Sequence, residues 1–310
     1  MDTLTPVGRF APTPSGRMHL GNVFAGLIAW LSVKSLGGQM VLRMEDLDTQ
    51  RTSAEFGQVL RQDLTWLGLT WDWEMPPQSQ RGKVYDRYFE QLREEGLLYP
   101  CYCTRSQLHS VNAPHLSDGT YVYPGTCRNL TQEQRQAQTR LPAWRVQVPD
   151  RLWTVEDKIQ GHFSMNLATD CGDMVVRRAD GVYVYQLAVT VDDGEAGVNQ
   201  VVRGSDLLSS APRQMFLQER FGFAHPEYAH VPMLLAPDGR RLSKRDKDLD
   251  MGCLRLHTTP EALLGILAKS AGLTETSAPI SAGELAAEFR WDKLGRQDIC
   301  LDAQALLAAL

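Results

Sequence analysis

Apolar and polar positions in the first part of the chain follow two different periods in turn. Residues 7–11 form a short apolar run that ends in a loop rich in proline and glycine at residues 12–16. Apolar side chains then recur at the spacing of an amphipathic helix, at Phe24, Leu27, Ile28 and Leu31. Residues 40–45 form a second apolar run. This order predicts a strand, a loop, a helix and a strand, the unit from which parallel α/β sheets are built.

Two more helices are predicted before the middle of the chain. Thr52 and Glu55 form a capping-box pattern ahead of an apolar helical face. Residues 79–95 place aromatic side chains on one face, which indicates core packing, and Gly96 follows them. Residues 97–140 are irregular and rich in turn residues, so we interpret them as an insertion.

The second half of the chain returns to short apolar runs. A hairpin with an Asp-Gly turn is predicted over residues 173–185. A helix is predicted to begin at Ser210 and to end at Gly222. Strands are predicted at residues 144–148, 198–202 and 231–235. After Pro260 the sequence is rich in alanine and leucine and has a helical pattern.

Composition limits the class of protein. The 310 residues are 43% hydrophobic and 22% charged, as in ordinary globular proteins. The net charge of −5 argues against a protein that coats nucleic acid non-specifically, because such binding rests on neutralising phosphates. No apolar run approaches the roughly 20 residues that span a bilayer, and the N-terminus lacks the pattern of a signal peptide. We therefore expect a cytoplasmic protein that is not attached to a membrane.

The loop before the first helix has the chemistry of a phosphate site. Its candidate ATP-binding residues are Pro14, Ser15, Gly16, His19, Gly21 and Asn22. Glycine lets the backbone approach a nucleotide closely, and the first turn of a helix presents free N–H groups and a positive dipole end. His19 and Asn22 can each donate a hydrogen bond to phosphate. A surface histidine without such a role is the alternative for His19 taken alone.

A short cationic loop follows much later, after a Pro-Asp-Gly turn. It contributes the candidate ATP-binding residues Arg241, Leu242, Ser243, Lys244 and Arg245. Lys244 can place a positive charge on phosphates as negative charge builds in a transition state. A solvated charged face is the alternative when the run is taken alone. The two loops together indicate ATP chemistry, with His19 and Lys244 as the candidate catalytic residues.

Three of the six cysteines, Cys101, Cys103 and Cys127, lie close together in the sequence. In a cytoplasmic chain such a cluster favours metal ligation over disulfides. His109 and His115 are nearby and are also possible ligands by chemistry. Three free thiols in a loop are the alternative.

The loops at residues 19–22 and 241–245 resemble the two ATP-handling signatures of class I aminoacyl-tRNA synthetases. Four further blocks resemble the glutamyl branch of that class, in order, at residues 9–16, 42–48, 183–193 and 202–208. The resemblance covers about residues 7–250. It implies a Rossmann-type parallel sheet, ATP as a substrate together with magnesium, and glutamate as the amino acid. The chain departs from the common pattern at Asn22, where many synthetases have histidine, and at Arg241, where many have lysine. Both residues keep hydrogen-bonding or charge character.

The resemblance also implies a glutamate pocket. Its residues are Arg9, Phe10, Ala11, Pro12, Thr13, Glu45, Tyr185 and Arg203. Arg9 and Arg203 are expected to hold carboxylate groups, since a guanidinium group binds a carboxylate through two hydrogen bonds. Glu45 is expected to bind the α-ammonium group and Tyr185 to line the pocket. For Arg9, a structural salt bridge is the alternative.

The family further implies one structural zinc ion, held by Cys101, Cys103, Tyr123 and Cys127. Cysteine is the usual ligand of structural zinc, whereas tyrosine is uncommon. A site with four protein ligands would order an insertion that has few apolar residues of its own.

Chain length points to one subfamily within this branch. Full glutamyl-tRNA synthetases continue into a large helical domain that reads the anticodon, and too few residues follow Lys244 for such a domain. The chain therefore resembles the shortened paralogues, the glutamyl-Q tRNA(Asp) synthetases, which transfer L-glutamate to queuosine in tRNA(Asp). We expect a monomer. Its Rossmann-type catalytic domain is predicted in two parts, residues 1–96 and 141–250. A zinc-binding insertion at residues 97–140 separates them, and a short helical C-terminal region follows at residues 251–310.

Three other functions are consistent with parts of the sequence. A truncated glutamyl-tRNA synthetase would charge the 3′ end of its tRNA. A small-molecule adenylyltransferase would use the same nucleotide loop. A tRNA-binding paralogue would have no activity, although His19, Lys244, Arg9 and Glu45 are all present here.

Overall fold

The computed structural model describes residues 5–104, 106–107, 122–240, 242 and 249–301. Its centre is a parallel sheet in which β1 (Val7–Phe10), β2 (Gln39–Leu42) and β3 (Trp73–Glu74) lie in that order. Helix α1 (Leu20–Lys34) connects the first two strands. The predicted unit of strand, loop, helix and strand is therefore confirmed.

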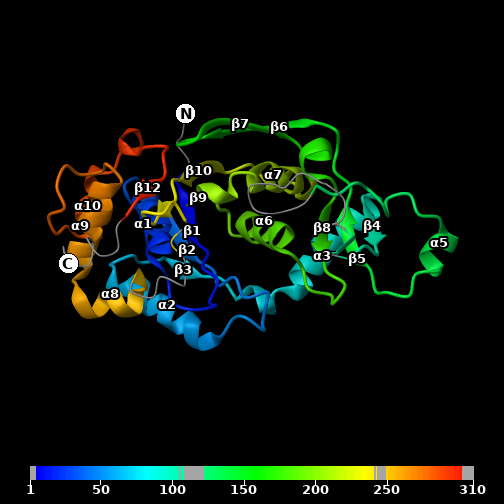
Figure 1. Ribbon diagram of the computed structural model, residues 1–310, viewed down its shortest axis with the longest axis horizontal. Coiled ribbons are helices and arrows are strands. Elements are labelled where there is room, and N and C mark those ends of the chain that lie inside the picture. The colour runs from blue at the N-terminus through cyan, green and yellow to red at the C-terminus, as the bar shows by residue number, and fades with distance from the viewer. Residues whose placement is uncertain (1–4, 105, 108–121, 241, 243–248, 302–310) are drawn as a thin grey trace.

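The second half of the chain lies directly beside β1. Strands β9 (Gln200–Gly204) and β10 (Glu227–Val231) pair in parallel. The backbone N–H of Val7 donates to the side chain of Asn199 over 2.7 Å, and the Asn199 N–H donates back to the Val7 carbonyl over 3.0 Å. Figure 1 shows these strands between the C-terminal helices at one end of the molecule and the helices of the second half.

The N-cap of helix α2 (Ala54–Trp66) lies one residue later than predicted. The Ser53 side chain accepts the Phe56 N–H over 3.1 Å and is the N-cap. The predicted capping box at Thr52 and Glu55 is therefore wrong. The Thr52 hydroxyl instead donates to the Asp48 carbonyl in the preceding turn, at 2.9 Å.

Helix α3 (Gly82–Glu94) follows a short 3₁₀ turn at Gln78–Gln80, so it begins later than residue 79. The predicted insertion is only partly irregular. Strand β4 (Leu98–Cys101) pairs with β5 (Ala143–Val146), which pairs with β8 (Met174–Arg177), in an antiparallel sheet. A short helix, α5 (Gln132–Gln136), lies at the far end of the molecule in Figure 1.

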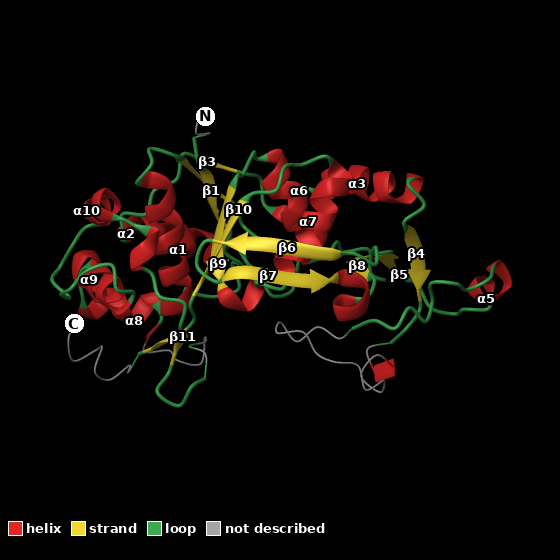
Figure 2. Cartoon of the chain, turned by 90° about the horizontal axis from the view of Figure 1, so that it is seen from above, coloured by secondary structure: helices red, strands yellow, loops and turns green. Residues whose placement is uncertain are grey.

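An antiparallel hairpin that the sequence analysis did not predict joins β6 (Leu152–Asp157) to β7 (Gly161–Asn166). Figure 2 shows it as the pair of long strands that crosses the molecule. A π-helical turn, Leu167–Cys171, follows it. The hairpin predicted over residues 173–185 is found in its first arm, β8, and at its turn, where Gly181 has a φ of +86°. Its second arm is short: Tyr183 pairs antiparallel with Arg177, and helix α6 (Tyr185–Glu195) begins at Tyr185.

Helix α7 (Ser210–Phe221) ends at Gly222, as predicted, with a φ of +74° at that glycine. It is preceded by a 3₁₀ turn at Ser205–Leu207. The strand predicted at residues 231–235 is found as the end of β10 and a separate β11 (Leu234–Leu235), which pairs with β12 (Ile299–Cys300).

The predicted helical C-terminal region is confirmed. Its elements are α8 (Met251–His257), α9 (Pro260–Ser270), α10 (Ala282–Glu288) and a 3₁₀ turn at Trp291–Lys293. Pro260 occupies the first helical turn, where its missing N–H costs nothing. Apolar residues of α9 and α10 join those of α1 in the largest buried cluster. Among the described residues, no helix is long and apolar enough to cross a membrane.

Candidate active site

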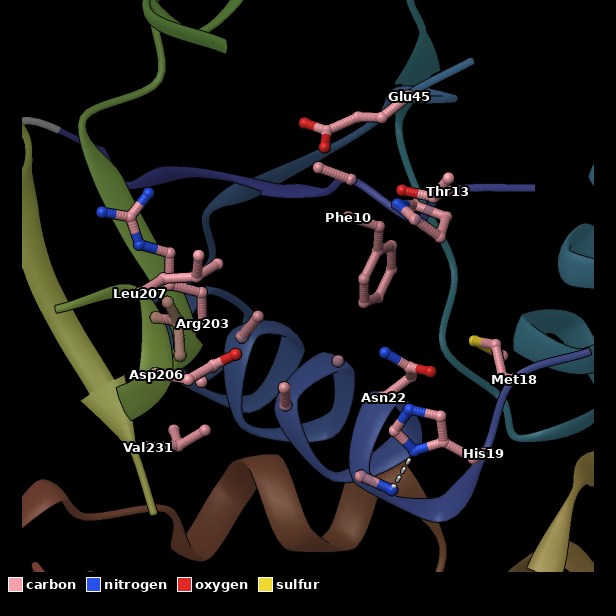
Figure 3. Close-up of a pocket in the computed structure, with 18 of the residues that line it drawn as sticks. Phe10, Thr13, Met18, His19, Asn22, Glu45, Arg203, Asp206, Leu207 and Val231 are labelled. Carbon is pink, nitrogen blue, oxygen red and sulfur yellow. Dashed lines mark hydrogen bonds between the residues drawn. The ribbon is translucent and has the colours of Figure 1, made fainter. Parts of the chain in front are cut away.

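A cavity of about 570 Å³ lies between the start of α1 and the ends of β1 and β9. Figure 3 shows His19 and Asn22 on one side of it and Arg203, Asp206, Leu207 and Val231 on the opposite side. Parallel strands place their carboxyl ends at one edge of the sheet, where ligands of such folds bind. The cavity therefore lies where the fold itself favours a ligand.

Most described members of the predicted ATP set line this cavity, namely Ser15, Gly16, His19, Gly21, Asn22 and Leu242. Among the described members, Pro14 alone does not. Its carbonyl accepts the Ser53 N–H over 3.0 Å, so it connects the loop to the start of α2. Arg241, Ser243, Lys244 and Arg245 lie outside the described residues.

The His19 side chain is held by the first turn of α1. Its Nδ1 accepts the Gly21 N–H over 3.1 Å, which makes His19 the N-cap. A neutral imidazole that accepts at Nδ1 carries its proton on Nε2 and is a donor there. A Cβ at Gly21 would lie 3.0 Å from the imidazole Cε1. Glycine at this position therefore allows the close approach of backbone and ring.

The predicted glutamate residues Arg9, Phe10, Ala11, Pro12, Thr13, Glu45, Tyr185 and Arg203 all line the same cavity. Arg9 reaches Asp193 Oδ2 with its Nε at 3.4 Å and donates to the Val202 carbonyl from Nη1 at 3.1 Å. Arg9 thus takes part in a structural salt bridge and also contributes to the cavity wall.

Two residues that the sequence analysis did not assign to the site organise this wall. Arg43 donates from Nη1 to Asp193 Oδ1 at 2.5 Å and from Nη2 to Glu45 Oε1 at 3.0 Å. Burial opposes the charged form of Asp193, but Arg43 and Arg9 hold its pKa below the usual range. Burial raises the pKa of Glu45, although Arg43 partly counters this. The sequence did contain a feature that could have identified Arg43 and Asp193, because both are charged residues next to apolar runs.

Arg203 is 5% exposed and is held by neutral groups. Its Nε donates to His230 Nε2 at 2.9 Å, and its Nη1 donates to Gln214 Oε1 at 2.8 Å and to Tyr185 Oη at 3.5 Å. Its Nη2 is buried and has no hydrogen-bond partner among the described residues. A buried donor without a partner is costly, which marks it as a group that a ligand can satisfy.

The 3₁₀ turn at Ser205–Leu207 and residues 231–234 contribute further lining residues that the sequence analysis did not assign to the site. They are Asp206, Leu207, Val231, Pro232, Met233 and Leu234. Most are apolar, so no charge pattern distinguishes them in the sequence from ordinary core residues.

The cysteine cluster forms a second candidate site. The thiol sulfurs of Cys101, Cys103 and Cys127 all lie within 4.8 Å of one another. The Tyr123 hydroxyl oxygen lies 3.5 Å from Cys101 Sγ and 4.0 Å from Cys103 Sγ. The structure therefore brings all four predicted metal ligands together. His109 and His115, the alternative ligands, lie outside the described residues.

Arg145 is the cation next to this cluster. Its Nε donates to Cys101 Sγ at 3.3 Å, and its guanidinium carbon lies 3.6 Å from the centre of the Tyr123 ring. Burial opposes thiolate formation, but Arg145 lowers the pKa of Cys101 below its usual value. Three sulfurs and one oxygen at this spacing suit a tetrahedral zinc ion, whose structural sites are rich in cysteine.

Comparison with known proteins agrees with this arrangement. Residues 7–292 match the family described as tRNA synthetases class I (E and Q), catalytic domain. The chain is 42% identical to a glutamyl-Q tRNA(Asp) synthetase of Symbiobacterium thermophilum, with 97% of each chain covered. It is 44% identical to one of Nitratidesulfovibrio vulgaris, with 88% of each covered.

Solved structures give the same relationship. A glutamate tRNA ligase from Elizabethkingia meningosepticum superposes with a TM-score of 0.81 at 29% identity, covering 97% of this chain and 68% of that one. A glutamate-tRNA synthetase from Elizabethkingia anophelis superposes with a TM-score of 0.82. The parallel-sheet fold predicted from the sequence is thereby confirmed. The chain belongs to the class I tRNA synthetases of the E and Q type and, within them, to the glutamyl-Q tRNA(Asp) synthetase family.

Proposed function

We propose that this protein activates L-glutamate with ATP and transfers it to queuosine at the wobble position of tRNA(Asp). In the first step a glutamate α-carboxylate oxygen attacks the α-phosphorus of ATP. The bond to the leaving pyrophosphate breaks, and glutamyl-adenylate forms. In the second step a hydroxyl oxygen on the cyclopentene ring of queuosine attacks the acyl carbon. AMP leaves with the bonding electron pair, and the hydroxyl proton is released.

One observation carries this proposal: His19, Glu45 and Arg203 line a single cavity although they come from separate parts of the fold. A phosphate-binding loop and a wall that recognises acids then serve the same reaction. Holding two substrates in reacting geometry and stabilising charge supply most of the rate in such transfers.

The ATP half of the cavity is assigned to the α1 loop and the wall facing it. The Nε2–H of His19 donates to a phosphate oxygen, and Gly21 leaves room for the nucleotide beside the helix N-terminus. The apolar side chains of Leu207, Val231 and Leu242 suit a flat base. Lys244 is assigned to the leaving pyrophosphate, and magnesium bound with ATP would supply further positive charge there.

The glutamate half is assigned to the charged wall. Arg203 meets the side-chain carboxylate, because its buried Nη2 is a donor with no partner among the described residues. Glu45 pairs with the α-ammonium group, Arg9 supports the carboxylate side, and Tyr185 closes the pocket. These assignments use charge complementarity in a desolvated site, where ion pairs discriminate strongly.

We assign one structural zinc ion to Cys101, Cys103, Tyr123 and Cys127. When bound, zinc supplies a cross-link between β4 and the loop before α5, and no chemistry of the reaction. The monomeric state, the cytoplasmic location and the division into residues 1–96, 97–140, 141–250 and 251–310 stay predictions.

The test uses tRNA(Asp) with and without queuosine. Purified enzyme is given ATP and labelled glutamate, and incorporation into each tRNA is measured. We expect label only in the queuosine-containing tRNA. Incorporation into unmodified tRNA would contradict the proposal and favour a glutamyl-tRNA synthetase that charges the 3′ end.

Pyrophosphate exchange across the amino acids separates the remaining alternatives. Among the amino acids, we expect only glutamate to support exchange, and we expect that exchange not to require tRNA. Exchange with a different acid and no labelled tRNA would indicate a small-molecule adenylyltransferase. No exchange with any amino acid would indicate a tRNA-binding protein without activity.

A further inference from the structure

Arg203 differs from two neighbouring buried arginines, Arg9 and Arg43, in the charge of its partners. Arg9 and Arg43 both pair with Asp193. Arg203 donates to an imidazole, a carboxamide and a phenol, and among the described residues no carboxylate lies within ion-pair distance of it. Its positive charge is therefore not cancelled by direct contact, although it is almost completely buried.

The imidazole partner belongs to a buried chain of three groups. His230, on β10, is 0% exposed, and its Nδ1 lies 2.6 Å from Asp157 Oδ2. Because His230 Nε2 accepts from Arg203, its proton is on Nδ1, where it donates to Asp157. Burial lowers the pKa of His230 to about 4, so the ring is neutral at pH 7.

Asp157 is held independently of this contact. Its carboxylate accepts the backbone N–H groups of Ile159, Gln160 and His230 at distances of 2.9 to 3.1 Å. The negative charge of Asp157 is thus fixed at the end of β6, and the imidazole ring of His230 lies between it and the guanidinium group of Arg203. Arg203 therefore has a fixed hydrogen-bond acceptor in His230 Nε2, but no carboxylate in direct contact among the described residues.

We propose that His230 and Gln214 are positioning residues that orient Arg203 with neutral acceptors and so keep its charge for an anionic substrate side chain. This inference rests on the proposed function, because it assigns the Arg203 Nη2 to the side-chain carboxylate of glutamate. A carboxylate placed directly on Arg203 would compete with that substrate group for the same donors. A missing acceptor would let the guanidinium group rotate away from its productive orientation.

Two variants of the full chain test the two parts of the inference. Gln214→Glu changes an amide to a carboxylate at nearly constant shape, 2.8 Å from Arg203 Nη1 in the parent structure. We expect at least a tenfold rise in the KM for glutamate, with the KM for ATP within twofold of the parent. His230→Leu removes the acceptor at similar volume, and we expect the same split between the two KM values.

His230→Gln is the matched control, since its side-chain oxygen again offers a neutral acceptor to Arg203. We expect its KM for glutamate to return to within threefold of the parent. Thermal unfolding of each variant shows whether it folds, and Gln214→Glu decides the question if His230→Leu does not fold.

The results separate the inference from the function on which it rests. If the parent enzyme does not support exchange with glutamate, the proposed function fails. If the parent is active but folded Gln214→Glu keeps the parental KM for glutamate, the neutral-partner inference fails. Equal rises in both KM values would show a general disturbance of the cavity and would also overturn it.

Discussion

His19 and Gly21 are joined by a hydrogen bond in which the Gly21 backbone N–H donates to Nδ1 of the imidazole over 3.1 Å. This one contact caps α1 and also sets which ring nitrogen carries the proton. The cap and the donor at Nε2 are therefore two roles of the same side chain, and substitutions can separate them.

His19→Ala should remove both roles. We expect glutamate-dependent pyrophosphate exchange to fall about 100-fold, the usual loss for one donor to a developing charge. Stability should fall by about 1 kcal/mol, because the helix cap is lost. His19→Asn is the control: it can still cap the helix, so stability should return while exchange stays low. Recovery of exchange in His19→Asn would contradict the role of Nε2.

Lys244 lies outside the described residues, and its role rests on the sequence. We expect Lys244→Ala to lower glutamate-dependent exchange at least tenfold, because one charge contact to the phosphates is lost. Arg240→Ala is the matched control, since it removes a cation from the same loop whose guanidinium group pairs locally with Asp238. Unchanged exchange in folded Lys244→Ala would remove Lys244 from the site.

The buried carboxylate of Asp193 should contribute strongly to stability. Asp193→Asn leaves Arg9 and Arg43 without their shared counter-charge, and we expect a loss of about 3 kcal/mol in the free energy of unfolding. Glu90→Gln is the control, because it breaks an exposed pair with Arg93 on α3. That change should cost less than about 0.5 kcal/mol. Denaturant unfolding measures both losses. Equal losses would contradict a stabilising role for the buried ion pairs of Asp193 with Arg9 and Arg43.

The buried His230 predicts a specific pH dependence of stability. Its pKa is lowered from 6.5 to about 4 in the folded protein, because burial disfavours the imidazolium. Between these pH values the unfolded chain binds more protons than the native chain, so stability is full above about pH 6.5 and falls as the pH drops toward 4. The loss should be on the order of 2–3 kcal/mol.

His230→Gln removes this titration and should flatten the stability curve between pH 4 and 6.5. The paired Asp157 has its pKa below the usual carboxyl range: burial opposes its charged form, but the interactions with His230 and the backbone N–H groups together outweigh burial. The stability that Asp157 contributes is therefore lost only at lower pH, below the range in which His230 titrates. An unchanged slope in the variant would show that other groups cause the dependence.

Metal analysis should find one zinc ion per chain in protein purified without chelator. Cys127→Ser should lose most of the metal and expose the insertion to proteolysis, because structural zinc binding is coupled to local folding. Cys253→Ser is the matched control, since Cys253 lies in α8 outside the cluster. Tyr123→Phe keeps the three thiols and should bind zinc more weakly in a competition with chelator. Metal-free parent protein would contradict the site.

Local sequence was sufficient for much of the fold because turn chemistry and apolar spacing act over a few residues. The apolar stripe of α1, the left-handed glycine at Gly222 and Pro260 at the start of α9 are such features. The same holds for the proximity of Cys101, Cys103 and Cys127 and for the loop before α1, because both depend on residues that are close together in the sequence. These parts were predictable.

Long-range contacts determined the rest. Arg43 and Asp193 are 150 residues apart in the chain, and His230 and Asp157 are 73 apart, so no local pattern pairs them. Tyr185 begins a helix where alternation suggested a strand, because α6 packs against α7 and α3 in the second core cluster. A buried charge needs a partner, but which partner it receives depends on the segments that the completed fold brings beside it.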